Sequence, residues 1–483
     1  MESLSQLQKQ LRETSETLLR ISEKLDDYGK NSGGNSVVAD DIDFEKLKFL
    51  GGNNAFKCHS LCKTATKSSY LILLLSVILT EKAKYDEWSF LYRVAAGGKY
   101  EDDIHELLPD AMTLTEKRIT DIISEIELAN LKSAFVLDSM SIYILNGEHS
   151  GKMLEYLADL YALMNIPSET VEEAAMLVKI ILEKDAKTYF EKVSSLKYVK
   201  PIDTLCYIYD IKDNLCDDIN AAKNIQAEHL IVFAAKATNL QAIDLDEWNA
   251  KEIEFIFVEF ENIFGIVCKN KHISFKFCKF FGNHTNNANA FLCISSCSFI
   301  KTQFEQFSGN FPIIDADKEI YIEQCIFKDC TAEFKIYKPQ CCSLITVKNG
   351  VVKKTEFLNC RASMKIRDDD IKTMRVTFID LNAVELCDCI FSSCSYYASN
   401  AYGWQTYCVY MVRGQQGSNI HNCHFHGCYC NSTGYIHQSS QYSYIVALKN
   451  SYEANNEFDK CISPRYVKER HQGDNFYVGN IEY

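Results

Sequence analysis

The chain has 483 residues, about three average domains in length, and is long enough to bury more than one hydrophobic core. Its 51 Lys and Arg and 65 Asp and Glu give a net charge of -14, so attraction to nucleic acid or to anionic lipid is not favoured. A hydrophobic fraction of 47%, with only 6 Pro and 20 Gly, excludes a largely disordered or collagen-like chain.

The sequence gives no sign of export or of a membrane span. Its first ten residues, MESLSQLQKQ, contain no basic segment leading into an apolar one, as a secretory signal would. The longest apolar run, residues 70–79 (YLILLLSVIL), is about half the length that crosses a bilayer and predicts a buried helix. We therefore expect a cytoplasmic protein whose 21 Cys are reduced and act as small buried apolar side chains.

Residues 1–28 predict a coiled-coil oligomerisation helix. Apolar residues recur in alternating steps of three and four, which is typical of a seam that a partner helix covers. Self-association is the simplest choice of partner, and a helix folded back onto its own domain is the alternative. Residues 29–42 include the stretch GKNSGGNS and predict a flexible linker. The seam consists of Leu4, Leu7, Leu11, Thr14, Leu18, Ile21, Leu25 and Tyr28.

Residues 43–198 predict an all-α helical bundle. Segments rich in Leu, Ala, Glu and Lys carry apolar residues at helical spacing, and Gly or Pro interrupts them near residues 97, 109, 147 and 167. Two stretches, beginning at residues 71 and 135, repeat one scheme: an apolar helix, a short polar turn and a second helix.

The second of these stretches resembles the tellurite-resistance TerB-like family of all-helical domains. The resemblance rests on a polar turn at Asn146, Gly147, Glu148 and Ser150 and on a later break at Met164, Asn165, Ile166 and Pro167. It implies a helical module of bacterial stress and defence proteins, with Glu148 and Glu155 as candidate metal ligands. The family's Asp is Asn146 here, and solvated carboxylates that cap a helix are the alternative interpretation.

Residues 199–228 are a mixed connector, and the pattern then changes from helical to alternating over residues 229–465. A phrase of the form Cys-x-Phe-x-x-Cys recurs there, and a repeat of this length with strands in each unit is typical of a solenoid. Residues 466–483 are expected to form a tail or cap. The phenylalanines of the phrase are Phe280, Phe299, Phe327, Phe357, Phe391, Phe425 and Phe458, at intervals of 19, 28, 30, 34, 34 and 33.

The phrase has a physical explanation in stacked parallel strands. Residues two apart in a strand point the same way, so Cys389 and Phe391 can both face inward while Ile390 faces out, and a turn then returns Cys394 to the interior. Stacked windings would place Phe on Phe and Cys on Cys. This half therefore resembles right-handed parallel β-helix proteins in general pattern, with an antiparallel β-sandwich as the alternative. The predicted fold class is a multi-domain α plus β protein: coiled-coil helix, helical bundle and β-helix.

One segment is rich in soft metal ligands. His421, Cys423, Cys428 and His437 lie within 17 residues of one another, and zinc accepts four Cys or His ligands at such short spacing. Interior packing of the two cysteines is the favoured alternative, because the Cys-x-Phe-x-x-Cys repeat already requires cysteines at these positions to face inward. No other cofactor is predicted, and zinc or another divalent metal stays as a second interpretation.

No residue earns a catalytic role from the sequence, so an enzyme is the less favoured class. Parallel β-helices often carry polysaccharide lyases and hydrolases, which need paired carboxylates or bound Ca²⁺ in a groove. The dense acidic run at residues 368–370 lies between two repeats and is expected to be a solvated turn.

The predicted function is a cytoplasmic scaffold or sensor that binds other proteins, within a bacterial stress or phage-defence assembly as the family resemblance implies. A carbohydrate-binding or carbohydrate-cleaving β-helix protein and a metal sensor are the alternatives. The candidate partner contacts are aromatic, because Tyr and Trp are enriched at interface hot spots, and packing between windings is their alternative role. They are Tyr396, Tyr397, Tyr402, Trp404 and Tyr407.

Overall fold

The computed structural model describes residues 43–462 except for short gaps, and the chain forms two compact units. The first unit ends at Asp213 and the second begins at Asn214, so the boundary falls inside the predicted connector of residues 199–228. The predicted coiled coil, the linker and the tail all lie outside the described residues. The gaps are residues 58, 82, 148–150, 210–213, 286–290, 310–311, 337–341, 367–372, 401–405, 434–440.

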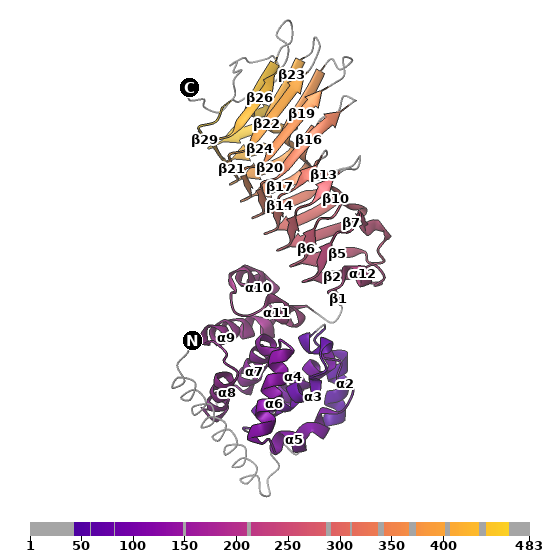
Figure 1. The fold of residues 1–483 in the computed structure, drawn as a ribbon, viewed down its shortest axis with the longest axis vertical. Helices are drawn as coiled ribbons and strands as arrows, with labels where there is room; N and C mark the ends of the chain where they lie inside the picture. The colour runs from indigo at the N-terminus through magenta and orange to yellow at the C-terminus, as the bar shows by residue number, and fades with distance from the viewer. Residues whose placement is uncertain are drawn as a thin grey trace, which may run out of the picture. The chain divides into compact units, whose positions relative to one another are not determined.

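The first unit is helical throughout its described part, as predicted (Figure 1). Three short 3₁₀ turns, η1 (Ser60–Lys63), η2 (Ile104–Leu107) and η3 (Val193–Ser195), lie between the α-helices. The α-helices are α2 (Phe44–Asn53), α3 (Lys67–Ile78), α4 (Tyr85–Gly97), α5 (Leu108–Met112), α6 (Glu116–Leu128), α7 (Lys132–Asn146), α8 (Gly151–Leu163), α9 (Ser168–Glu183), α10 (Ala186–Lys192) and α11 (Pro201–Ile208).

Helix α3 lies at the centre of this unit, because its apolar residues go all the way round it. Every residue from Ser69 to Ile78 is buried, and α3 contacts each of the helices α4 to α8. A helix that is apolar on all sides has no solvated face and must be enclosed by others. The expectation of a buried helix over residues 70–79 is therefore confirmed.

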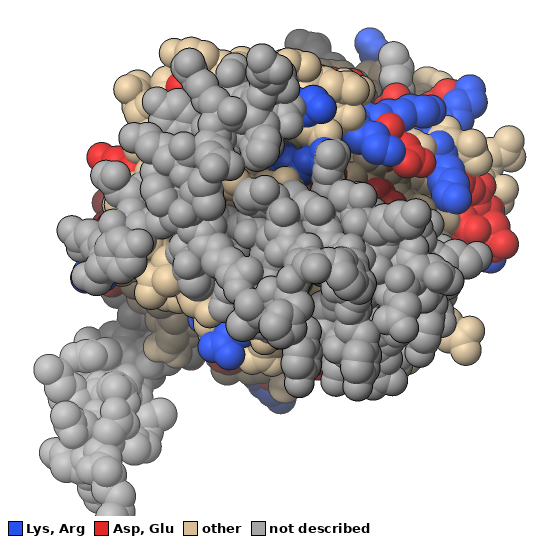
Figure 2. Space-filling view, turned by 90° about the horizontal axis from the view of Figure 1, so that it is seen from above, with Lys and Arg blue, Asp and Glu red and all other residues tan. Residues whose placement is uncertain are grey.

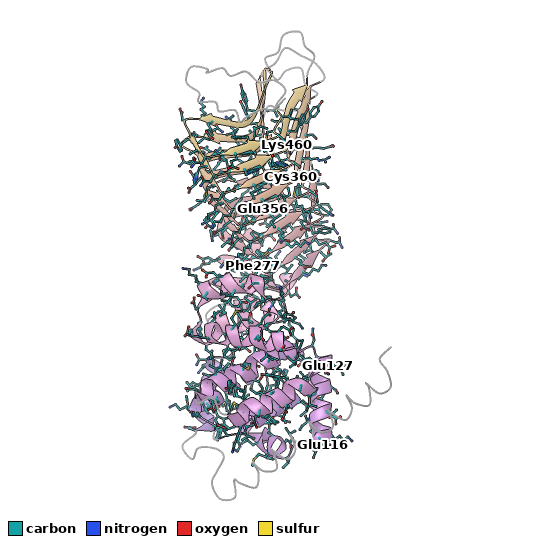
Figure 3. The ribbon with its side chains drawn as sticks, turned by 90° about the vertical axis from the view of Figure 1, so that its left-hand side faces the viewer. Glu116, Glu127, Phe277, Glu356, Cys360 and Lys460 are labelled. Atoms are coloured by element: carbon teal, nitrogen blue, oxygen red, sulfur yellow. The ribbon has the colours of Figure 1, made fainter. Side chains whose placement is uncertain are left out.

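Among the described residues, no single helix is both long and apolar enough to cross a membrane. Helices α6 and α7 reach the required length and composition only when taken together, across a bend of 119°. Glu116 and Glu127 mark the two ends of α6 in Figure 3.

Local sequence sets the helix ends. Helix α7 stops at Asn146 because the next residue, Gly147, has a φ of 73°, in the left-handed region that glycine occupies without steric cost. Helix α11 lies in the predicted connector and packs against α7 and α9 as part of the helical unit.

The described part of the second unit contains three parallel sheets, of fourteen, nine and six strands, with the short helices α12 (Ile219–Ala222) and η4 (Leu245–Glu247) near its start. The fourteen-stranded sheet consists of β1 (Asn214–Cys216), β2 (His229–Phe233), β4 (Ile243–Asp244), β5 (Glu252–Ile256), β7 (Ile266–Lys276), β10 (Leu292–Ile300), β13 (Ile314–Ala316), β14 (Ile320–Glu323), β17 (Cys342–Lys353), β20 (Thr373–Cys387), β23 (Thr406–Gln415), β24 (Asn419–His421), β27 (Gln441–Lys449) and β28 (Tyr452–Ala454).

The other two sheets are built from shorter strands. The nine-stranded sheet consists of β3 (Lys236–Thr238), β6 (Glu259–Glu261), β8 (Lys279–Phe281), β11 (Gln303–Glu305), β15 (Ile326–Lys328), β18 (Glu356–Leu358), β21 (Ile390–Ser392), β25 (His424–His426) and β29 (Glu457–Asp459). The six-stranded sheet consists of β9 (His284–Thr285), β12 (Ser308–Gly309), β16 (Thr331–Ile336), β19 (Arg361–Ile366), β22 (Ser395–Asn400) and β26 (Tyr429–Thr433).

The chain visits the three sheets in rotation. Strands β17, β18 and β19 belong to the fourteen-, nine- and six-stranded sheets, and β20, β21 and β22 repeat the order one strand further along each sheet (Figure 1). Every strand pairing of the described residues is parallel, which excludes the antiparallel β-sandwich. The arrangement is consistent with a parallel β-helix-like fold.

The predicted column of stacked phenylalanines is present and runs through the nine-stranded sheet. Phe327, Phe357, Phe391 and Phe425 are all fully buried, and neighbouring ring centroids in this series lie 4.6–5.0 Å apart with nearly parallel planes. Stacks of this kind combine apolar burial with favourable offset-ring contacts. The last described ring of the column is that of Phe458, which lies 5.0 Å from that of Phe425.

One member of the predicted column was wrong. Phe299 lies on β10 of the fourteen-stranded sheet, where it stacks on Phe275 at 5.0 Å. The position in the column belongs to Phe304, which stacks on Phe280 at 4.7 Å and on Phe327 at 4.5 Å. The error arose because two sheets carry inward phenylalanines and the phrase around Phe299 resembles the true one.

Several corners between the described sheets use the same device. A residue with positive φ, such as Asp388 (54°) or Ser393 (54°), turns the chain, and the cysteine after it points inward. The thiol then donates to a backbone carbonyl of the preceding winding, as Cys394 does to Phe357 O at 3.2 Å. Cys360 lies in the same column of thiols (Figure 3). No described cysteine forms a disulfide.

Outward positions carry charges of both signs. Lys236 pairs with Glu261 at 2.9 Å, and Lys279 pairs with Glu305 at 3.0 Å. The face shown in Figure 2 likewise has Lys and Arg beside Asp and Glu rather than a patch of one sign. Exposed pairs of this kind add little stability.

Candidate functional site

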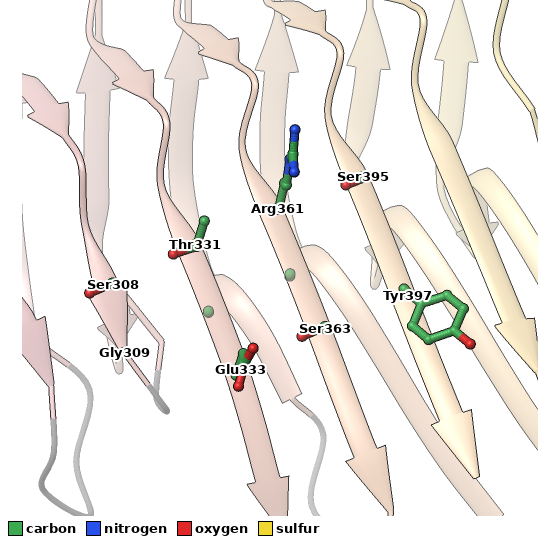
Figure 4. A pocket seen from close by; sticks show the side chains of 10 residues that line it. Ser308, Gly309, Thr331, Glu333, Arg361, Ser363, Ser395 and Tyr397 are labelled. Carbon is green, nitrogen blue, oxygen red and sulfur yellow. The ribbon is translucent and has the colours of Figure 1, made fainter.

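A polar groove lies on the outer face of the six-stranded sheet. It encloses about 580 Å³ and extends over strands β12, β16, β19 and β22 (Figure 4). This volume is within the range of small-molecule and peptide sites. Its lining consists of Ser308, Gly309, Thr331, Ala332, Glu333, Arg361, Ala362, Ser363, Ser395 and Tyr397.

Strand register sorts the lining into two outward rows. Thr331, Arg361 and Ser395 occupy equivalent positions on neighbouring strands, with Ser308 in the same row. The second row, two residues further along each strand, contains Glu333, Ser363 and Tyr397 (Figure 4). Members of a row are about 4.8 Å apart, the spacing between paired strands.

The residues between the two rows face the interior. Ala332 and Ala362 are buried in the hydrophobic core, and their backbone forms the floor of the groove. The inward methyl groups of these two alanines pack in the core and hold the strands there. The groove therefore stands on regular strands, which position side chains more rigidly than loops do.

The chemistry of the groove suits a polar ligand. Its hydroxyl groups can both donate and accept hydrogen bonds, Arg361 supplies a forked set of donors and Glu333 a pair of acceptors. Both charged side chains are exposed, and Arg361 donates from Nη2 to Asn359 Oδ1 at 3.3 Å. Tyr397, 37% exposed, adds an aromatic ring at one end.

The predicted partner-binding aromatics fall into three groups. Tyr397 lies in the groove, whereas Tyr396 is completely buried, so the structure contradicts its role as a surface contact. The reason is strand alternation, which turns adjacent residues of β22 to opposite faces. Tyr402 and Trp404 lie outside the described residues, and Tyr407 is on β23 with its side chain outside them.

The predicted cysteine ligands of a metal are interior packing groups. Cys423 and Cys428 are buried, and their thiols donate to Leu386 O at 3.7 Å and Phe391 O at 3.4 Å. His421 is instead on the outward face, bound to Glu385 Oε1 at 3.0 Å. The structure therefore does not bring His421 together with these two thiols, and His437 lies outside the described residues.

A different group with metal-ligand chemistry surrounds His421. One ligand atom from each of Glu385, Cys387 and His421 lies within 4.8 Å of the others, and this is the one such group of three in the part of the chain that the structure describes. Burial, the Glu385 charge and Asp388 raise the pKa of the Cys387 thiol to about 11. At neutral pH without a cation, the thiol is therefore protonated.

The two polar turns of the helical unit meet. Asn146 Nδ2 donates to Glu87 Oε1 at 2.8 Å, and Lys84 Nζ donates to the carbonyl of Asn146 at 2.6 Å. Burial raises the pKa of Glu87, although Lys84 N and Asn146 Nδ2 both donate to its carboxylate. Of the two ligands implied by the family resemblance, Glu155 is exposed on α8 and Glu148 lies outside the described residues.

A second buried polar cluster joins α11 to the rest of the helical unit. Asp138 of α7 accepts from Tyr70 at 2.7 Å, from His59 Nε2 at 3.1 Å and from Tyr207 of α11. His59 Nδ1 accepts from Leu61 N at 3.2 Å, which assigns the ring proton to Nε2. Burial and the Asp138 charge raise the pKa of both Tyr70 and Tyr207 well above the ordinary value, so both remain donors.

The sequence analysis did not predict the two rows of the groove, although the positions that follow the repeated cysteines indicate them. The first and third residues after the second cysteine of the repeat face outward. Arg361 and Ser363 follow Cys360 in this way, and Ser395 and Tyr397 follow Cys394. The cluster around Cys387 was hidden for another reason. Asp388 at the corner has positive φ and interrupts the alternation, so Cys387, although buried, lies beside the side chains of Glu385 and His421, whereas Cys389 packs in the core.

The comparisons with known proteins identify no relative. No protein-family model matches the chain, and no curated protein or solved structure matches it significantly.

Proposed function

We propose that the chain is a non-enzymatic cytoplasmic scaffold or sensor, in which a right-handed parallel β-helix binds an extended polar segment of another protein along its groove. The helical unit serves as a TerB-like module, and residues 1–28 join copies of the chain. A bacterial stress or phage-defence assembly is the proposed setting.

The observation that supports this proposal is the pair of side-chain rows in the groove. An extended peptide exposes backbone N–H and C=O groups, which hydroxyl side chains can satisfy from either row. Arg361 and Glu333 can bind opposite charges on the partner, and the Tyr397 ring offers an anchor of the kind found at interface hot spots.

Charge reversal in the groove tests the proposal. We expect Arg361→Glu to reduce the amount of a specific partner recovered with the protein from its native cells by about tenfold or more, as loss of a central interface Arg does. Lys328→Glu is the matched control, because Lys328 is exposed on β15 of a different sheet. Equal recovery of every partner with the two variants would contradict the proposal.

Carbohydrate binding is the second candidate, favoured by the same tyrosine. An exposed aromatic ring beside hydroxyls, a guanidinium and a carboxylate can stack on a sugar ring and bind its hydroxyls. Titration with a panel of soluble glycans, followed by release of reducing ends, separates binding from cleavage. Saturable glycan binding that Tyr397→Ala abolishes would replace the protein partner with a glycan.

A further inference from the structure

The group formed by Glu385, Cys387 and His421 is produced by strand register. Glu385 and Cys387 are two residues apart on β20 and project from the same face, and His421 of β24 pairs directly with Cys387. A backbone hydrogen bond fixes this register, because Asp388 N donates to His421 O at 3.2 Å, and Lys354 N holds Cys387 O from the winding before at 3.1 Å. The three side chains therefore start from a rigid sheet.

Their donor atoms are already close to the separations that a metal ion requires. His421 Nε2 lies 3.0 Å from Glu385 Oε1, and the Cys387 sulfur completes a triangle with no side longer than 4.8 Å. Ligand atoms around tetrahedral Zn²⁺, with bonds of about 2.0–2.3 Å, are roughly 3.3–3.8 Å apart. Side-chain movements of about 1 Å would shorten the longest separation, at most 4.8 Å, to this range and bring all three ligand atoms onto one ion.

The neighbouring strands leave room for this ion. On one side, Lys353 lies opposite Cys387, but its ammonium pairs with Glu323 at 3.1 Å and lies over the Tyr321 ring. On the other side, Ala454 lies opposite His421 and presents only a methyl group. A bound water can therefore occupy a fourth position.

We propose that Glu385, Cys387 and His421 form a binding site for a divalent first-row transition metal, with Zn²⁺ as the ion that suits them best. Carboxylate oxygen, thiolate sulfur and imidazole nitrogen are all ligands of Zn²⁺, and three protein ligands with an open fourth position are typical of exchangeable or reactive zinc. When the metal–sulfur bond forms, the thiol proton leaves to solvent. The site is on a different sheet from the groove and is independent of the proposed partner.

The test uses the full-length chain, purified without a histidine tag and kept reduced, and titrated with Co²⁺. We expect one equivalent of Co²⁺ to bind, with the near-ultraviolet charge-transfer absorption of a cobalt–thiolate bond, and one equivalent of Zn²⁺ to abolish that absorption. Cys387→Ser and His421→Ala should each weaken binding by more than the roughly tenfold that removal of an outer-shell group costs. Cys293→Ser is the control, because Cys293 is a partly exposed cysteine on β10 outside the group.

Three results would overturn the proposal. They are the absence of metal binding by the parent chain, binding without the thiolate absorption, and equal affinity in Cys387→Ser and Cys293→Ser. Thermal unfolding of each variant identifies a folding defect. If Cys387→Ser is unfolded, Glu385→Gln takes its place, because it retains the shape of an exposed side chain and should weaken Co²⁺ binding without loss of the thiolate absorption.

Discussion

At the scale of single residues, the inward cysteines act as small hydrogen-bonded packing groups. Cys330, Cys360, Cys394, Cys428 and Cys461 donate to the carbonyls of the preceding phenylalanines at 3.2–3.4 Å. At these corners each thiol adds a hydrogen bond from one winding to the winding before it. The thiol supplies a donor while filling little more space than alanine.

A neighbouring column shows that a hydroxyl can do the same. Thr302 Oγ1 donates to Phe275 O at 3.1 Å, in the position that Cys325 occupies one winding later. Burial raises the pKa of Cys325 to about 12, so its thiol keeps the proton that it donates to Phe299 O at 3.4 Å.

We therefore expect Cys325→Thr to leave stability nearly unchanged and Cys325→Ala to cost about 1 kcal/mol, because only alanine removes the side-chain hydrogen bond to Phe299 O. Urea unfolding followed by circular dichroism measures both variants. If alanine and threonine destabilise the strand unit equally, the thiol contributes by volume alone and the hydrogen-bond argument is wrong.

At the scale of elements, α11 depends on a buried polar cluster rather than on length. The helix has eight residues, too few to be stable alone. Tyr207 of this helix donates to Asp138 of α7, and its ring stacks on Phe90 with centroids 6.1 Å apart. These contacts hold α11 against the core of the helical unit.

Removal of the Asp138 carboxylate should destabilise the helical unit more than removal of one of the side chains that donate to it. We expect Asp138→Ala to destabilise the helical unit by about 3–5 kcal/mol, because His59, Tyr70 and Tyr207 lose their common acceptor in a buried site. Tyr207→Phe should cost only about 1 kcal/mol, the value of one hydrogen bond. Calorimetric unfolding compares the two, and a smaller loss for Asp138→Ala would refute a role for the cluster.

At the scale of the whole molecule, the two described units have separate cores. The helical unit packs around α3, and the strand unit packs around its phenylalanine columns. The predicted oligomerisation residues, Leu4, Leu7, Leu11, Leu18, Ile21 and Leu25, lie outside the described part, so their role stays a prediction.

Deletion of residues 1–28 tests that role. We expect the shortened chain to become monomeric, because it loses the seam that a partner helix covers. Light scattering coupled to size-exclusion chromatography measures the change against the mass of one 55.2 kDa chain. Deletion of residues 466–483 is the control and should leave the oligomer intact. An unchanged oligomer in the first variant would move the contact to another part of the molecule.

The sequence by itself determined that one half is helical and that the other is built of parallel strands. It also determined that the cysteines and phenylalanines of the repeat face inward. These features are local or periodic: a helix buries every residue of a fully apolar run, and alternation sends Cys389 and Phe391 inward while Ile390, 41% exposed, faces solvent. Repetition then turned one local pattern into a prediction of stacked rings.

Only the tertiary structure decided which residues meet across windings. The groove joins residues up to about 90 positions apart in the chain, from Ser308 to Tyr397, and the group at His421 depends on the register between β20 and β24. Register is set by backbone hydrogen bonds and by corner residues such as Asp388, whose positive φ reverses which side chains face out. Pairing between residues so far apart produces no periodic pattern in the sequence. The sequence therefore places Phe299 in the wrong column and gives no sign of the group around Cys387.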